Sequence, residues 1–461
     1  MTQADDDGVE GMNVILPSNE VVNNPLYEDD DEGMDYVYSG AGYYAKRPVQ
    51  YGYFVGYERD RALYVAEPDS TLDSPLVDAV PVKPSDPKNV AEAVAVGNPE
   101  RAAWLEALAA EWKMIVDSGT VGQKVRIPVG AKALPTSWVL VRKHLPDGSV
   151  ERYKARLVVR GDQQRPGVDF FEVFAPVAQR GTLRLVMGLA NHHDLDILQL
   201  DVTGAFLHSD LPEDLYIRQP QGFHDGDRAM GYKLYKSLYG LRQAPLLWYN
   251  KVKADLTGMG YEEQEDPGLF KHGVTGVMIL VYVDDFLVVG SKQAAREALE
   301  AILGLYQCRD LGECTHYLGI SVVRDRVRRR LKLHQESYAR DLVARHGLAK
   351  CNPVSTPMEV NVDLKGDGVL CGKGSEYRAI VGGLLYLATC TRPDLSCAAG
   401  KLSRYMSAPT VAAFAAAKRV LRYIAGTLDL GICFGSGSPG AQGYCDSDWA
   451  GDFESRRILG S

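Results

Sequence analysis

Hydrophobic and polar positions alternate regularly from residue 100 onward, and their period predicts both helices and strands. The segment 100–119 spaces its large apolar residues along one helical face, which predicts an amphipathic helix that ends near Gly119. Two β-rich runs within 137–161 flank a Pro-Asp-Gly turn and predict a hairpin. The chain therefore mixes both kinds of element from its first patterned segments.

The same two periods continue to the end of the chain, and helices dominate its last third. The further predicted elements are a helix at 181–194, a strand running into a helix at 196–207, two short strands within 276–290, a helix at 292–306, strands at 315–323 and 330–334, helices at 335–347, 376–390, 393–406 and 411–427, and a strand at 441–448. This succession predicts an α+β fold.

One apolar run contains two adjacent acids. The stretch 279–289 reads ILVYVDDFLVV, so Asp284 and Asp285 interrupt what otherwise resembles the inside of a sheet. Two ionised carboxylates in such surroundings repel each other and lose hydration, which is costly unless a proton or a cation compensates. The run is too short to span a membrane.

A third acid supports a metal-binding interpretation. Asp201 ends the apolar strand ILQLD, and it can share a sheet edge with Asp284 and Asp285 if both strands lie in one sheet. Three carboxylates from two strands suit two Mg²⁺ ions about 3.5–4 Å apart, the arrangement used in phosphoryl and nucleotidyl transfer. A turn or a solvated sheet edge would also explain the acids, whereas no calcium-loop pattern surrounds them.

Composition separates an acidic leader from a larger body. The chain has 461 residues, 46% of them hydrophobic, which predicts more than one domain. Residues 1–100 carry 20 acidic and 6 basic side chains, and the remainder carries 45 basic and 40 acidic ones. We interpret 1–99 as a largely disordered leader, although its tyrosines could instead form short strands or a partner-binding patch.

The cysteines and the N-terminus indicate an intracellular setting. None of the eight cysteines forms a CxxC pair, which favours reduced thiols over disulfides or a zinc site. We expect neither a secretory signal nor a membrane helix, and we therefore expect the cytoplasm or the nucleus.

Several motifs together resemble one family. The stretch LVYVDDFLVVG resembles the catalytic hairpin of reverse transcriptases, and LDVTGAFLHSDLPEDLYIRQPQGF followed by YKLYKSLYGLRQAPLLWY resembles the copia-type retrotransposon polymerase. The segments RYKARLVVRGDQQRPGVDFFEVFAPVAQRGTLRLV, HYLGISV, YRAIVGGLLYLATCTRPDLS and AAKRVLRYIAGT continue the resemblance in family order. The match runs from about residue 100 to the C-terminus.

The resemblance implies roles for individual residues. Asp201, Asp284 and Asp285 correspond to the metal-binding catalytic triad, and Phe206 to an aromatic gate against the ribose 2′-hydroxyl; a plain core role would also explain Phe206. The implied nucleotide-binding residues are Lys154, Arg156, Gln243 and Tyr282, of which the two cations could also be exposed strand residues. Tyr317, Leu318 and Gly319 resemble a hairpin that holds the primer end, although strand packing explains them almost as well. Arg184 and Trp248 also match family motifs, and we interpret both as structural.

The C-terminal stretch GYCDSDWAGD resembles the first strand of a ribonuclease H domain, with Asp446 as its first metal ligand. The continuation SRRILGS departs from the family pattern, and only 15 residues follow Asp446. We therefore expect no ribonuclease H activity from this chain.

The resemblance implies a right-hand polymerase. We expect the leader at 1–99, fingers and palm at 100–330, a helical thumb or connection at 331–428, and a truncated ribonuclease H-like start at 429–461. The implied activity is RNA-directed DNA synthesis with Mg²⁺ or Mn²⁺, an RNA template, a DNA or RNA primer and deoxynucleoside triphosphates, in a cytoplasmic virus-like particle or the nucleus. An inactive remnant that serves as a nucleic-acid-binding scaffold and a metal-dependent nuclease or phosphatase are the alternatives.

Overall fold

The computed structural model describes residues 85–144 and 149–435 in full, together with the backbone of four short strands outside them. These strands are β1 (Asp35–Ser39), β2 (Gly42–Lys46), β19 (Ser447–Asp448) and β20 (Leu459–Gly460). β1 pairs antiparallel with β2, and β19 pairs antiparallel with β20. Most of the acidic leader and the predicted ligand Asp446 lie outside the described residues.

The packed part of the chain begins before residue 99. The short helix α2 (Val90–Ala93) buries both of its terminal residues in the main hydrophobic core. The Asp86 carboxylate accepts a hydrogen bond from the backbone N–H of Arg142 at 2.9 Å. Residues 85–99, which the composition groups with the leader, therefore pack against the following domain.

A six-stranded antiparallel sheet forms the centre of the protein, with the strand order β10-β11-β12-β13-β7-β14. Its strands are β7 (Asp196–Val202), β10 (Tyr261–Glu263), β11 (Leu269–His272), β12 (Met278–Tyr282), β13 (Asp285–Gly290) and β14 (Cys308–Glu313). The prediction of two short strands with the acids at their junction is confirmed by β12 and β13. The predicted strand running into a helix is confirmed as well, because β7 leads into the 3₁₀ helix η2 (Ala205–His208).

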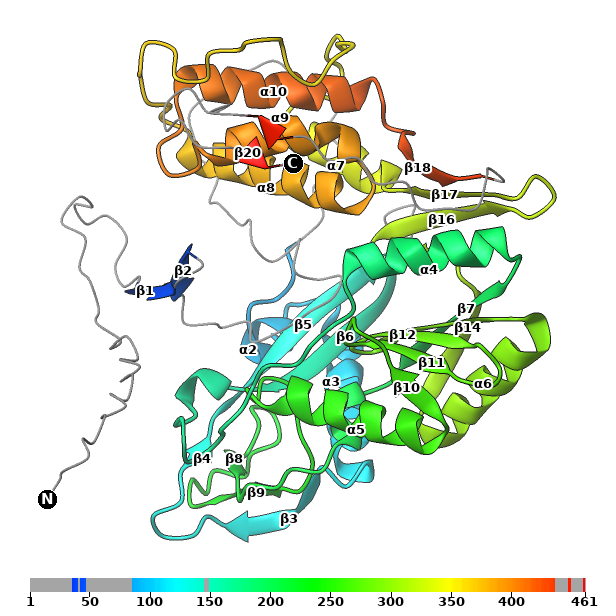
Figure 1. The fold of residues 1–461 in the computed structure, drawn as a ribbon. Coiled ribbons are helices and arrows are strands. Elements are labelled where there is room, and N and C mark those ends of the chain that lie inside the picture. Colours follow the sequence, from blue (N-terminus) through cyan, green and yellow to red (C-terminus); the bar gives the residue numbers. More distant parts are fainter. Residues whose placement is uncertain are drawn as a thin grey trace, which may run out of the picture.

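Helices cover both faces of this sheet (Figure 1). They are α4 (Arg180–His192) on one face and α5 (Ala244–Gly258) and α6 (Lys292–Leu305) on the other. The alternation of β13 explains this arrangement, because Leu287 packs into the core beneath α4 while Phe286 and Val288 pack into the core shared with α5 and α6.

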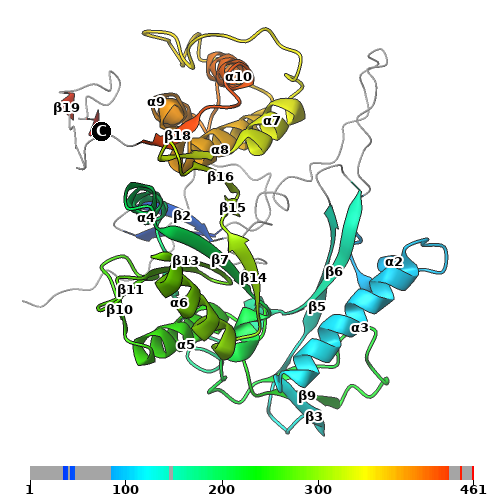
Figure 2. The same cartoon turned by 90° about the vertical axis from the view of Figure 1, so that its right-hand side faces the viewer.

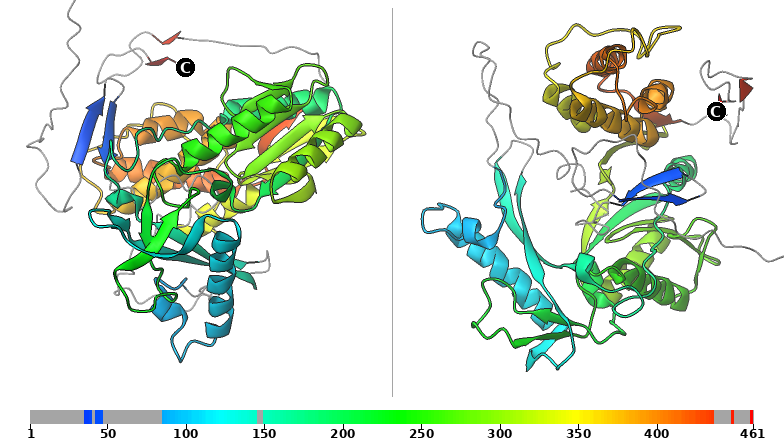
Figure 3. Two further views of the ribbon diagram at one scale, coloured as in Figure 1. Left: turned by 90° about the horizontal axis from the view of Figure 1, so that it is seen from below. Right: turned by 90° about the vertical axis from the view of Figure 1, so that its left-hand side faces the viewer.

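A long hairpin stands beside the sheet as a separate arm (Figures 2 and 3). It consists of β5 (Thr136–His144) and β6 (Val150–Val159), and α3 (Arg101–Asp117) packs against β6. The predicted hairpin and amphipathic helix are thus confirmed. A second small sheet of order β3-β9-β8-β4 follows, formed by β3 (Val121–Arg126), β4 (Ala133–Leu134), β8 (Tyr216–Arg218) and β9 (Met230–Leu234).

The C-terminal third combines a four-stranded sheet with a helical group. The sheet runs β15-β16-β17-β18 and contains β15 (His316–Tyr317), β16 (Ile320–Asp325), β17 (Arg330–His334) and β18 (Gly431–Phe434). The helices are α7 (Glu336–Arg345), α8 (Gly374–Cys390), α9 (Ser396–Ser403) and α10 (Val411–Ala425), which share a core of their own. Two further 3₁₀ helices are η1 (Gly161–Gln163) and η3 (Pro393–Leu395). Among the described residues, no helix combines the length and the apolar character that crossing a bilayer requires.

Glu111 is a buried carboxylate whose charge should reduce the stability of the fold. Glu111 in α3 is 8% exposed, and its carboxylate accepts the Leu157 backbone N–H at 3.3 Å. Burial raises the pKa of Glu111 to about 7, against a partial compensation by that hydrogen bond and by Arg156 and Lys154. The folded state therefore holds a proton that the unfolded chain releases, and stability falls as pH rises from about 4.5 to about 7.

We expect Glu111→Gln to remove this pH dependence. The amide keeps an acceptor for Leu157 and carries no charge, so the variant should gain about 2–3 kcal/mol of unfolding free energy at pH 8 and much less at pH 5. Denaturant unfolding at both pH values measures this difference. Glu106→Gln on the exposed side of α3 is the matched control. An equal gain for Glu111→Gln at both pH values would contradict the prediction.

Candidate active site

The register of two neighbouring strands brings the three predicted acids to one end of the central sheet. Asp201 of β7 lies directly opposite Asp285, the first residue of β13. Directly opposed residues of an antiparallel pair point to the same face. Tyr282 and Asp285 close the hairpin β12–β13, so Val283 and Asp284 form its two-residue turn. Three carboxylates from two strands thus lie close together.

Burial makes this cluster costly. It raises the pKa of Asp285 to about 7, and the neighbouring charges of Asp284 and Asp201 add to the effect, while a hydrogen bond with the Gln199 side chain opposes it. The pKa of Asp284 is raised by burial as well, although the positive charge of Arg156 opposes the change. A cation at this edge would therefore stabilise the ionised carboxylates.

A cation of the protein itself already contacts one of them. Arg309 of β14 lies opposite Asp201 on the side of β7 away from β13. Its Nε donates to Asp201 Oδ2 at 3.0 Å, and its Nη2 donates to the same oxygen. Asp201 is therefore directed toward Arg309. In the parts of the chain described here, no three His, Cys, Asp or Glu side chains are gathered as ligands of a metal ion.

The donor set nevertheless fits a hard divalent cation. Carboxylate oxygens are the ligands that Mg²⁺ uses in proteins, and an added positive charge would favour the ionised forms of Asp284 and Asp285, whose pKa values are raised by burial. Both hydrogen bonds from Arg309 end on Oδ2, so Asp201 could join such a site through Oδ1 beside Arg309, or through both oxygens after the ion pair breaks. The structure thus places three candidate carboxylate ligands at one sheet edge, and Arg309 pairs with one of them.

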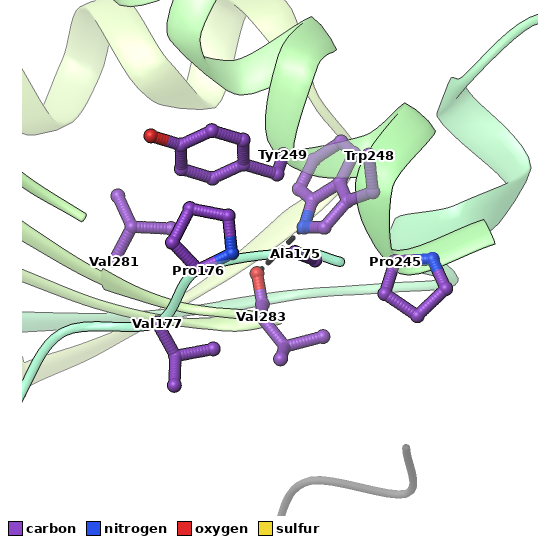
Figure 4. Close-up of a pocket in the computed structure, with 8 residues that line it drawn as sticks. All are labelled: Ala175, Pro176, Val177, Pro245, Trp248, Tyr249, Val281 and Val283. Carbon is purple, nitrogen blue, oxygen red and sulfur yellow. Dashed lines mark hydrogen bonds between the residues drawn. The ribbon is translucent and has the colours of Figure 1, made fainter. Parts of the chain in front are cut away.

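The turn that carries Asp284 is conformationally strained. Val283 has a φ of +56°, a left-handed conformation that costs a β-branched residue about 1–3 kcal/mol. Figure 4 shows an apolar pocket beside this turn, to which Pro176, Trp248 and Tyr249 contribute. Tyr282, which precedes the turn, is half-buried at the end of β12.

An aromatic contact connects the predicted gate to the hairpin arm. Phe206 in η2 is 6% exposed and meets the ring of Tyr239 edge-on, with 5.2 Å between ring centroids. The Arg156 guanidinium lies over the same Tyr239 ring at 5.3 Å. Arg156 and Lys154 alternate with the buried Ala155 and Leu157, so both cations point away from α3. Phe206 and Arg156 are thus brought together around Tyr239.

Gln243 is buried where α5 begins, and its predicted contact with the nucleotide stays a prediction. It is 2% exposed at the N-terminus of α5, and its amide Nε2 donates to the Asp169 carbonyl at 3.0 Å and to the Glu213 carboxylate at 3.2 Å. Its Oε1 accepts from Gln164 at 3.0 Å. The side chain thus fixes the loop after β6, and it offers no unused amide group to a nucleotide in this conformation.

The three predicted primer-binding residues divide into two groups. Tyr317 is 1% exposed, and its hydroxyl donates to the Asp285 carbonyl at 3.2 Å, so its side chain supports the acidic hairpin from below. Leu318 and Gly319 form the half-buried turn between β15 and β16, with φ values of +50° and +77°. The hydroxyl of Tyr386 in α8 donates to the Leu318 carbonyl at 3.3 Å. Only the turn itself remains available to a ligand.

Two residues of the site were not predicted from the sequence. Arg309 lies in a segment without a strand pattern. This segment, CRDLGE, contains one large apolar residue, Leu311, and that residue is exposed. Tyr239 occurs within the motif SLYGL, whose tyrosine carries no local sign of proximity to Arg156 or Phe206. Both contacts join residues that are distant in sequence, so only the folded chain reveals them.

Comparison with known proteins shows that this chain is a protein of the reverse transcriptase class. Residues 120–360 match the family described as reverse transcriptase (RNA-dependent DNA polymerase). That match covers more than half of the chain, and the chain therefore belongs to this family.

Curated relatives narrow the family further. The retrovirus-related Pol polyprotein from transposon TNT 1-94 of Nicotiana tabacum is 36% identical over 387 residues, and that from transposon RE2 of Arabidopsis thaliana is 39% identical over 356 residues. These matches cover 81% and 76% of this chain but only 29% and 24% of the two relatives. The putative transposon Ty5-1 protein of Saccharomyces cerevisiae is 31% identical over 268 residues, 82% of its length. The resemblance to copia-type retrotransposon proteins is confirmed.

Removing the internal counter-ion should strengthen metal binding. We expect Arg309→Gln to bind Mn²⁺ about two- to fivefold more tightly than the wild type, because the substitution removes a positive charge that competes for Asp201 and repels the metal. Electron paramagnetic resonance of free Mn²⁺ during a titration measures the affinity. Arg296→Gln is the matched control. Arg296 of α6 pairs at 2.7 Å with Asp310, the residue that follows Arg309 on β14. The same gain in both variants would indicate a general charge effect and contradict the prediction.

Proposed function

We propose that this chain is an RNA-directed DNA polymerase of a copia-type retrotransposon, which extends a primer with deoxynucleoside triphosphates. The observation that carries the proposal is the register that sets Asp201 opposite Asp285 with Asp284 at the adjoining turn. The family supports the general activity, and the chain spans about a quarter of the length of the plant polyproteins it matches. The activity, substrates and partners of those longer proteins are therefore part of the proposal.

The residues of the site would divide the work of nucleotidyl transfer. Two Mg²⁺ or Mn²⁺ ions held by Asp201, Asp284 and Asp285 would supply Lewis-acid activation of the primer hydroxyl and charge neutralisation at the leaving phosphate. Arg156 and Lys154 would bind the triphosphate, for which a forked or a point cation is suited. These two cations lie on β6, and their positive charges oppose the rise in the pKa of Asp284 that burial causes.

The neighbouring residues would select and position substrates. Phe206 would lie under the sugar and exclude a 2′-hydroxyl, supported from behind by Tyr239. Gln243 would shape the nucleotide pocket through the loop that it fixes, and Tyr282 would border it. The turn at Leu318 and Gly319 would contact the primer end, with Tyr317 as its buried support.

We assign the described elements to a right hand on the same basis. The hairpin β5–β6 with α3 would form the fingers, the six-stranded sheet with α4, α5 and α6 the palm, and α7 to α10 the thumb or connection. The segment 429–461 would form the start of a ribonuclease H-like domain. Its first described strand, β18, pairs with β17, so this segment starts as part of the preceding sheet.

Primer extension tests the proposed activity. On an RNA template with a DNA primer, the wild type should add deoxynucleotides in the presence of Mg²⁺, and Asp284→Asn should lose at least about 10³-fold of this rate because one ligand charge is missing. Asp310→Asn on the adjacent strand β14 is the matched control and should retain activity. RNA binding without Mg²⁺-dependent extension by the wild type would instead support the scaffold, and strand cleavage without synthesis a nuclease.

Sugar selection tests the role of Phe206 separately. We expect Phe206→Val to raise incorporation of ribonucleotides relative to deoxynucleotides by about tenfold or more, since the smaller side chain leaves room for the 2′-hydroxyl. Single-nucleotide kcat/KM values for the matched dNTP and rNTP measure the ratio. Phe223→Val, which alters an aromatic cluster with Trp112 and Trp138, is the control. If the ratio of the dNTP and rNTP kcat/KM values is unchanged in Phe206→Val, Phe206 has a purely structural role.

A further inference from the structure

The turn between β12 and β13 contains a residue that does not favour its conformation. Two-residue hairpin turns that need a positive φ usually contain Gly, Asn or Asp, whose side chains tolerate it. Here the position belongs to Val283 at φ +56°, where a β-branched side chain crowds its own backbone. The surrounding structure must therefore hold the turn in place, and the acid pair follows directly after the strained residue.

Three consecutive carbonyl groups at this turn each accept a hydrogen bond from a different element. The Val283 carbonyl accepts from the Trp248 indole Nε1 at 2.7 Å, as Figure 4 shows. The Asp284 carbonyl accepts from the Val202 backbone N–H at 2.8 Å, and the Asp285 carbonyl accepts from the Tyr317 hydroxyl at 3.2 Å. The peptide planes that determine the directions of the two carboxylates are thereby fixed from α5, β7 and β15.

The Trp248 indole is itself firmly placed. Its side chain is 2% exposed, and its ring meets those of Tyr306 and Phe286 with centroid distances of 5.1 and 6.5 Å. Its indole N–H is directed at the one carbonyl that belongs to the strained residue. Simple core packing requires the ring of a tryptophan but not a hydrogen bond to that atom.

We propose that Trp248 is a positioning residue: its indole N–H holds Val283 in the left-handed conformation and thereby aims the carboxylates of Asp284 and Asp285. The inference rests on the proposed function of these acids as metal ligands. Trp248 lies in α5, five residues after Gln243, which is the N-cap residue of this helix. Helix α5 therefore connects the loop of the proposed nucleotide pocket to the acidic turn. Loss of the indole donor should let the turn relax and scatter the two carboxylates.

A strain-relief pair distinguishes this role from packing. Trp248→Phe keeps an aromatic ring but removes the donor, and Val283→Gly removes the reason for the donor, because glycine adopts positive φ readily. We expect Trp248→Phe to weaken Mn²⁺ binding about tenfold and the double variant to bind within about twofold of Val283→Gly alone. Trp104→Phe, equally buried in α3, is the control and should leave Mn²⁺ binding unchanged.

Hydrogen exchange of the metal-free protein gives a second measurement that needs neither metal nor activity. In Trp248→Phe, the peptide covering 281–287 and the amide of Val202 should exchange about tenfold faster, and Val283→Gly in the same chain should restore most of the protection. Tyr317→Phe, which removes another of the three hydrogen bonds, should change exchange in the same direction.

The outcomes separate the two levels of the argument. If Trp248→Phe and Trp104→Phe weaken Mn²⁺ binding equally, the proposal is overturned. It is also overturned if the double variant of Trp248→Phe and Val283→Gly binds Mn²⁺ no more tightly than Trp248→Phe alone. In either case Trp248 is a packing residue. If the wild type binds no Mn²⁺, the proposed metal site fails, while hydrogen exchange still decides whether Trp248 holds the turn. Primer extension by Trp248→Phe gives a separate measurement. If Trp248 is a positioning residue, the substitution lowers kcat by a larger factor than it raises the KM for the nucleotide.

Discussion

Mutual repulsion and lost hydration among three carboxylates form the constraint around which this protein is arranged. Asp201, Asp284 and Asp285 lie at one end of the central sheet because β7 and β13 pair in one register, and burial raises the pKa of Asp285 to about 7. Arg309 compensates from β14 and Arg156 from the hairpin arm. Each neighbouring element therefore either supplies positive charge to the cluster or fixes its backbone.

Fixing the backbone is needed because charge compensation alone does not determine direction. A turn with a left-handed valine would relax if its carbonyl groups were unpaired, since no favourable backbone region lies at that φ for a β-branched residue. Hydrogen bonds from three separate elements remove this freedom. Helix α5 and strand β15 thus act on the acids through main-chain carbonyls, although neither contributes a carboxylate.

The helical group is attached to the sheet close to the same place. Arg180 of α4 donates to the Thr389 hydroxyl of α8 at 2.7 Å, and its guanidinium lies over the Tyr386 ring at 5.1 Å. Tyr386 in turn donates to the carbonyl of Leu318, one residue after the buried Tyr317. Helix α8 is thereby connected directly to the turn at Leu318, the turn that we propose as a primer contact.

Local pattern alone determined the elements whose signal lies within one segment. The helix α3, the hairpin β5–β6, the junction of β12 with β13 and the C-terminal helices α7 to α10 all follow from hydrophobic period and turn residues. The order of the motifs along the chain determined the family. The sequence also predicted that the three acids form one group. These features depend on neighbours in sequence, so a single chain reveals them.

Tertiary structure decided what depends on distant partners. Strand β14 has almost no apolar period, and it forms because its backbone completes the edge of β7; this pairing brings Arg309 to Asp201 across 108 positions of sequence. Gln243 and Tyr317 match motifs for ligand contact, yet packing buries both and directs their polar groups to Asp169 and Asp285. Sequence thus determined which side chains gather, whereas their directions were decided by the strands and helices that pack against them.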